Sequence, residues 1–168
     1  MLNKPETRTI CVLLLFSGLG YGMVLNGLKG HIEASCGAWW LGIILPLHAL
    51  AGIASNWLGG PVCDRIGRRR TLGWGYTLGA IGLLLGAGPA YPVILMAATL
   101  LLGLQFAVVP LAVMAWIGDN TTTRDRPAVS GYILCFRDLG VALAILGGGL
   151  LPEIRVTFLV FAAISGLC

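Results

Sequence analysis

Apolar residues in this chain follow one another in long runs, and they show neither a 3.6-residue nor a 2-residue alternation with polar residues. Such runs are typical of membrane-spanning helices, because about 20 apolar residues of helix cross the roughly 30 Å hydrocarbon core of a bilayer. The pattern predicts an all-α membrane protein, a bundle of six transmembrane helices. The expected spans cover residues 10–28, 38–58, 71–88, 93–117, 128–151 and 156–168, the last of them incomplete.

The first and last runs need separate treatment. The run at 9–28 is longer than the roughly 7–15 apolar residues of a cleaved signal peptide, so we expect it to remain as the first span. The run at 156–168 would form only about 20 Å of helix at about 1.5 Å per residue, which does not cross the bilayer. We therefore expect this chain to be the amino-terminal piece of a longer protein, or a truncated one.

The composition agrees with a membrane bundle. The chain is 57% hydrophobic and 11% charged with a mean hydropathy of +0.89, whereas a soluble domain carries about 25% charged residues. Its 25 glycines are scattered through the apolar runs, and small residues allow membrane helices to pack closely. A transmembrane barrel would instead need segments of about ten residues with alternating polarity.

Basic residues gather in the connections on one side of the expected membrane. The segments 29–37 and 59–70 are predicted as loops, and a polar loop is expected at 120–126. The other side holds only Lys29 and Arg155. Positive loops remain in the cytoplasm, so we expect a multi-pass protein of the plasma (inner) membrane with a cytoplasmic N-terminus. The eight residues on the cytoplasmic side are Lys4, Arg8, Arg65, Arg68, Arg69, Arg70, Arg124 and Arg126.

Charge and cysteine content exclude several classes of partner. The net charge of +4 comes from short loops that orient a membrane protein, so we expect no nucleic-acid partner. The five cysteines are widely separated and lack the paired spacing of metal ligands. We expect neither a metal nor a cofactor.

The connection between the second and third runs carries a specific motif. Glycine, three residues, aspartate, arginine, one residue, glycine and a basic cluster resemble the signature loop of the major facilitator superfamily in both spacing and position. This resemblance implies the first half of a twelve-helix major facilitator fold, and it implies a transporter, not an enzyme. The matching residues are Gly60, Asp64, Arg65, Gly67, Arg68, Arg69 and Arg70.

Each residue of this motif suggests a structural role. Gly60 would allow a close helix approach, and Gly67 a sharp turn. Asp64 could cap a helix N-terminus. Arg68 could pair with an acid, and the resemblance favours Asp119 over Glu6 or Asp125.

The resemblance further implies that Asp64, Arg68 and Asp119 form a charge relay that stabilises the outward-open state. It also implies that Asp64 caps a helix of the second half, which this chain lacks. The alternative is that the arginines only hold the loop in the cytoplasm and meet lipid phosphates.

The fifth run partly resembles that of drug/proton antiporters. Gly131, Gly140 and the pair at 148–149 fit the spacing, but Ala144 and Ile145 replace the central Gly-Pro pair. An arginine that this subgroup places in the fourth run is here Thr99. Any proton coupling through this half would therefore not use that arginine.

Five polar residues within the expected spans are candidates for a substrate or proton pathway. Arg137 and Asp138 lie near mid-membrane, where a charge costs about 2.5–3.5 kcal/mol. Adjacent helical residues point about 100° apart, so we expect the two to have different partners. His48 could couple protons, and Asn26 and Gln105 could contact substrate. Snorkelling of the arginine and hydrogen bonds between packed helices are the alternatives.

These patterns favour secondary active transport of a small solute by alternating access, as part of a longer protein. The expected partners are the bilayer, the solute, protons, and the missing carboxy-terminal half or a second copy. The alternative is a half-size six-span protein that acts only as a dimer or partner subunit. An intramembrane serine protease is disfavoured, because Ser130 lacks a Gly-x-Ser context and lies at a span entrance.

Overall fold

Long helices account for nearly all of the described structure, a computed structural model that covers residues 5–89, 91–147 and 163. Side chains at 5–6 and 23–26 also lie outside the description. The predicted sixth span, apart from residue 163, and the end of the fifth fall outside the described residues. The helices are α1 (Pro5–Cys36), the short 3₁₀ helix η1 (Ala38–Trp40), α2 (Leu41–Ile66), α3 (Arg68–Ala87), α4 (Pro92–Asn120) and α5 (Arg126–Gly147).

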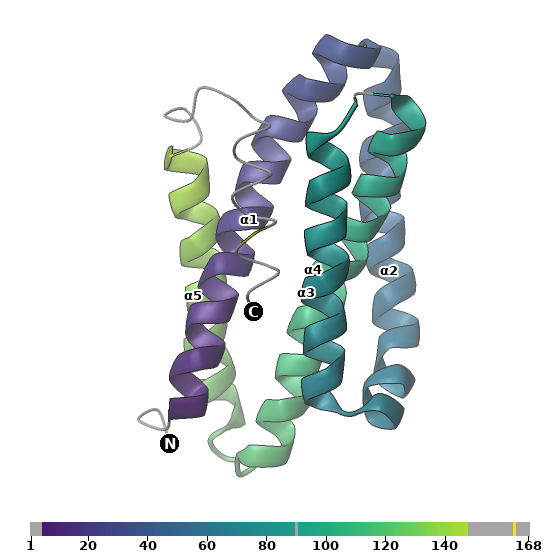
Figure 1. Cartoon of the computed structure of the whole chain (residues 1–168). Coiled ribbons are helices and arrows are strands. Elements are labelled where there is room, and N and C mark those ends of the chain that lie inside the picture. The colour runs from purple at the N-terminus through teal and green to yellow at the C-terminus, as the bar shows by residue number, and fades with distance from the viewer. Residues whose placement is uncertain (1–4, 90, 148–162, 164–168) are drawn as a thin grey trace.

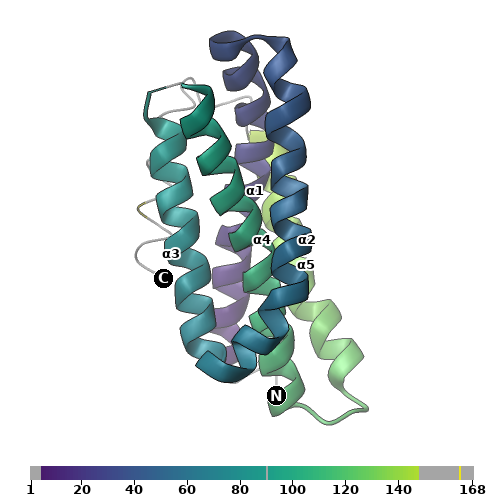
Figure 2. The same cartoon turned by 90° about the vertical axis from the view of Figure 1, so that its right-hand side faces the viewer.

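The five α-helices run roughly side by side as an up-and-down bundle (Figure 1). α4 packs against both α2 and α3, while α1 packs mainly against α5. The N-terminus and the α2–α3 and α4–α5 connections lie at one end, and the α1–α2 and α3–α4 connections at the other (Figures 1 and 2). The basic connections identified from the sequence therefore share one end of the bundle.

Four helical segments in the described part are long and apolar enough to cross a membrane: Thr7–Cys36, Ala38–Ile66, Pro92–Asn120 and Arg126–Leu146. The predicted span at 71–88 is present as α3, but it is not among the four. α3 begins with three arginines, and glycines take the place of larger apolar residues along it. Both features lower its mean hydropathy while leaving its length of 20 residues sufficient for a bilayer.

Two of the predicted loops are wrong. Segment 29–37 is helical up to Cys36, because it contains no proline and the side chains of Lys29, Glu33 and Ser35 are exposed along the helix surface. Segment 59–70 is helical on both sides of Gly67, which alone separates α2 from α3. Gly67 has φ 93°, a backbone conformation that favours glycine.

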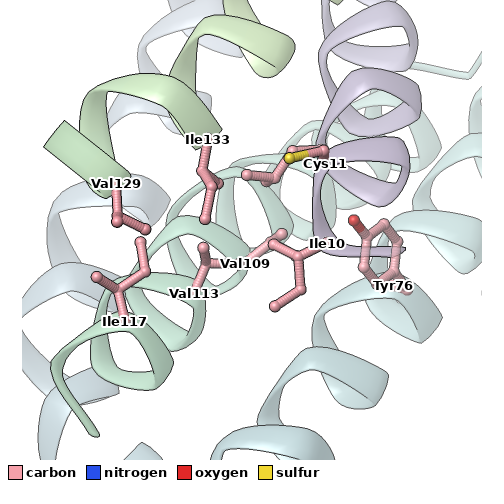
Figure 3. Packing of buried hydrophobic residues seen from close by; sticks show 9 residues of the cluster. Ile10, Cys11, Tyr76, Val109, Val113, Ile117, Val129 and Ile133 are labelled. Atoms are coloured by element: carbon pink, nitrogen blue, oxygen red, sulfur yellow. The ribbon is translucent and has the colours of Figure 1, made fainter. Parts of the chain in front are cut away.

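A buried cluster at the N-terminal end of the bundle joins four helices (Figure 3). α4 contributes the centre of this cluster, and α1, α3 and α5 surround it. The Tyr76 hydroxyl also donates a 2.9 Å hydrogen bond to the Leu13 carbonyl, which connects α3 to α1. The cluster consists of Ile10, Cys11, Leu14, Tyr76, Val109, Val113, Ile117, Val129 and Ile133.

Glycines bring backbones together where α1 crosses α5. A Cβ added at Gly18 would overlap the Arg137 carbonyl, and one added at Gly140 would overlap the Leu15 carbonyl. No side chain fits at either position without moving a backbone. This close α1–α5 contact, the α1–α5 seam, fixes the position of Arg137 along the length of α1.

Candidate functional site: a charge relay and a central cavity

The side chain of Arg68, at the start of α3, contacts two carboxylates on two other helices. Its Nη1 lies 2.5 Å from Asp64 Oδ1 in the last turn of α2, and its Nε lies 3.0 Å from Asp119 Oδ2 near the end of α4. Nη1 also lies 3.9 Å from the sulfur of buried Cys63. The three residues proposed as a relay from the sequence are therefore brought together.

Local chain geometry explains this arrangement. Because Gly67 turns the chain within one residue, Arg68 follows Asp64 by four positions and folds back onto it. Hydrogen bonds to Asp64 and Asp119 raise the pKa of the Arg68 guanidinium, which stays charged. Asp64 lies at a helix C-terminus, where a carboxylate is unfavourable, and Arg68 offsets that charge.

Two expectations for the motif differ from the structure. Within the described residues, Asp64 accepts a hydrogen bond from Arg68 instead of capping a helix N-terminus. Gly60 has no atom within 4 Å of an added Cβ, so it makes no close helix contact; the neighbouring Gly59 faces Leu111 of α4 instead. Capping of a second-half helix by Asp64 stays a prediction.

The remaining arginines of the motif have a different environment. Arg65, Arg69 and Arg70 are exposed, and none of them forms an ion pair with another described residue. The motif thus divides into one arginine that joins helices and three exposed arginines without a described ion pair.

A cavity of about 580 Å³ opens between α1, α2, α4 and α5. Its polar lining consists of Tyr21 from α1, His48 and Asn56 from α2, and Arg137 from α5. Apolar residues form the rest, among them Ile53, Phe106, Pro110, Leu111 and Met114. A mostly apolar hollow with a few converging polar groups is typical of a small-molecule site.

Aromatic stacking organises the cavity wall. The Tyr21 and Phe106 rings stack with centroids 3.8 Å apart and planes 16° apart. The His48 ring lies 5.5 Å from Tyr21, and Arg137 Cζ lies 5.7 Å from the Phe106 centroid. The His48 Nε2 atom is buried without a hydrogen-bond partner in the described part of the chain. The rings and the Arg137 guanidinium thus present a flat aromatic surface beside a cation.

The expectation that Arg137 and Asp138 have different partners is wrong. Arg137 donates from Nε and Nη2 to Asp138 Oδ1 at 3.0 and 2.8 Å. The long arginine side chain folds back over its neighbour, so the 100° separation along the helix does not keep the charged groups apart. Arg137 lines the cavity, whereas Asp138 does not.

The other two predicted pathway residues lie elsewhere. Asn26 belongs to α1, and its side chain is outside the described residues. Gln105 lies against Gly79 of α3 and lines a separate small cavity of about 20 Å³ with Ser17 and Tyr21. A volume of that size holds about one water molecule.

Of the lining residues, the sequence predicted only His48 and Arg137, and it missed Asn56 and Phe106 among others. Asn56 is a polar residue inside an apolar run and could have been found by that signal. No pattern in the sequence marks Phe106 as a cavity residue, because an aromatic residue in a span can face either lipid or the core. Across the described residues, no group of three His, Cys, Asp or Glu side chains could hold a metal ion.

Comparison with known proteins places this geometry in context. The family model described as "Major Facilitator Superfamily" matches residues 9–168. A facilitated trehalose transporter of Bombyx mori is 29% identical over 119 residues, covering 71% of this chain and 23% of that protein. Multidrug resistance protein 2 of Bacillus subtilis (strain 168) is 23% identical over 171 residues, covering 95% of this chain and 42% of that protein. The chain thus spans less than half the length of either relative.

Proposed function

Because this chain belongs to the major facilitator superfamily, we propose that it forms one half of a secondary transporter that moves a small solute by alternating access. Family membership and four apolar helices indicate an integral membrane protein with a role in transport. In alternating access, two bundles would rock about a site between them, so that the site opens to one side of the membrane at a time. The other bundle would be a carboxy-terminal half or a second copy.

The central cavity is the observation that carries this proposal. It is open, lies between four helices, and has the size of a small-molecule site. Solute would stack on the surface formed by Tyr21 and Phe106, and the Arg137 guanidinium would supply a polar contact. His48 is also our candidate for proton coupling, since imidazole titrates near neutral pH.

The relay of Asp64, Arg68 and Asp119 would act as a gate at the end of the bundle where the N-terminus lies. It joins the ends of α2, α3 and α4 through a single guanidinium. Seven described basic residues lie at or next to this end, which supports a cytoplasmic orientation for it: Arg8, Arg65, Arg68, Arg69, Arg70, Arg124 and Arg126. The paired relay would stabilise the state in which the cytoplasmic side is closed.

The test is transport by the full-length protein in proteoliposomes, with a panel of disaccharides and lipophilic cations, each with and without a proton gradient. Phe106→Ala should abolish most transport of any solute that is moved, because it removes one ring of the stack. Leu100→Ala is the matched control, since Leu100 lies on the same helix, is 38% exposed and does not line the cavity. Equal transport by both variants would refute the assignment of this cavity.

The gate has its own test. Asp64→Asn should reduce transport while membrane insertion, measured by fractionation, stays at the parent level. Unchanged transport would refute the gating role. Disulfide crosslinking between copies would identify a second copy as the other bundle, whereas transport by a monomer would favour a carboxy-terminal half.

A further inference from the structure

The three arginines outside the relay lie within one turn of the α2–α3 junction. Arg65 is in the last turn of α2, and Arg69 and Arg70 are in the first turn of α3. All three are exposed, and the nearby carboxylates Asp64 and Asp119 are both occupied by Arg68. This corner therefore carries three positive charges that no described carboxylate neutralises.

An apolar stripe continues from this corner along α3. Trp74 follows Arg70 by four residues, so the two side chains share a helix face. Trp74, Ile81 and Leu84 are 61%, 44% and 52% exposed, and they repeat at three- to seven-residue spacing along that face. The opposite face carries buried glycines that pack on α4, among them Gly75 and Gly79. The stripe is thus the side of α3 that points away from α4.

We propose that this corner and stripe bind an anionic phospholipid, with the headgroup phosphate at Arg69 and Arg70 and the lipid body along Trp74 and Ile81. Arginine guanidinium groups form paired hydrogen bonds with phosphate oxygens, and tryptophan prefers the membrane interface. A zwitterionic lipid would leave the three charges uncompensated. The inference requires that the helices span a membrane, but it does not require that the protein transports a solute.

The length of the stripe fits one leaflet. From Arg70 to Ile81 the helix rises about 16 Å at about 1.5 Å per residue, and half of the hydrocarbon core is about 15 Å. A phosphate at Arg70 therefore places Trp74 just below the headgroups and Ile81 near the ends of the acyl chains. Both the charge and the spacing along α3 match a lipid, whereas a free phosphate would use only the arginines.

The experiment measures quenching of Trp74 in the full-length protein, reconstituted in phosphatidylcholine vesicles that contain brominated phosphatidylglycerol or brominated phosphatidylcholine. The Trp74 signal is the difference between the parent protein and Trp74→Phe. Trp39→Phe gives the control signal, because Trp39 is 79% exposed but lies at the opposite end of the bundle. We expect Trp74, but not Trp39, to be quenched at a much lower fraction of brominated phosphatidylglycerol than of brominated phosphatidylcholine.

Two matched variants test the role of the corner. Arg70→Gln should raise the half-quenching fraction of phosphatidylglycerol roughly fivefold, the contribution of one basic residue at an anionic surface. Arg124→Gln removes the same charge from the α4–α5 loop at the same end and should change it little. Equal quenching by both lipids, an equal effect of the two variants, or relief of quenching by soluble inorganic phosphate would each overturn the proposal.

Discussion

Substitution of Gly140 by alanine tests the closest contact in the bundle, the seam between α1 and α5. A Cβ at Gly140 would overlap the Leu15 carbonyl oxygen and come within 2.8 Å of the Leu19 nitrogen. Both atoms belong to the α1 backbone, so a change of side-chain rotamer does not relieve the overlap. The two helices would have to separate by about 1 Å to restore ordinary contact, because the Cβ would lie only 2.2 Å from the Leu15 oxygen and close-packed interiors leave no slack.

The size of the effect follows from two opposing contributions. Overpacking costs about 1–3 kcal/mol, and more where backbone must move. Alanine gains up to about 1 kcal/mol over glycine in a helix interior. We therefore expect Gly140→Ala to lower the free energy of unfolding by about 2 kcal/mol.

Gly131→Ala in the same helix is the matched control, because no atom lies within 4 Å of a Cβ added there. It should leave stability unchanged or raise it by up to about 1 kcal/mol, the propensity gain alone. The assay is SDS-induced unfolding of both variants in mixed micelles, followed by circular dichroism. Similar unfolding midpoints for the two variants would refute the close α1–α5 seam.

Three further predictions use other contacts. Gly79→Ala should destabilise the protein less than Gly140→Ala in the same unfolding assay, because the three atoms nearest to the added Cβ all belong to the flexible end of the Gln105 side chain. Asp119→Asn should reduce transport in proteoliposomes, whereas Asp125→Asn should not, since Asp125 bonds Thr122 within the α4–α5 loop and not Arg68. Arg137→Gln should destabilise by about 2–3 kcal/mol, the cost of a lone charge within the membrane. Adding Asp138→Asn should recover most of that loss, and a double variant no more stable than the single one would contradict the pairing.

The sequence was most informative at the connection between α2 and α3, where a motif of known spacing could be compared with a family pattern. The resemblance implied that Arg68 contacts Asp64 and Asp119, and both contacts are present in the structure. The sequence failed for Arg137, since the reach of a flexible side chain does not follow from the direction of its Cα–Cβ bond. It also failed for the segment at 29–37, where polar residues continue a helix beyond its apolar part.

Helix faces were the second source of error. Apolar runs in a membrane protein are apolar on all sides, so their pattern does not tell which side meets a helix and which meets lipid. For this reason Gly59 and Gly60 could not be distinguished, nor could Phe106 be recognised as a cavity residue. The six-span layout, the orientation and the transport pathway stay predictions.

The single-residue turn at Gly67 has a mechanical consequence. With no slack between Ile66 and Arg68, a tilt of α2 is transmitted directly to α3. The α4–α5 connection is different, because residues 121–125 separate those helices and can absorb a change of angle. Lengthening the α2–α3 connection by a few flexible residues would therefore allow α2 and α3 to tilt independently, whereas in the native chain they tilt together.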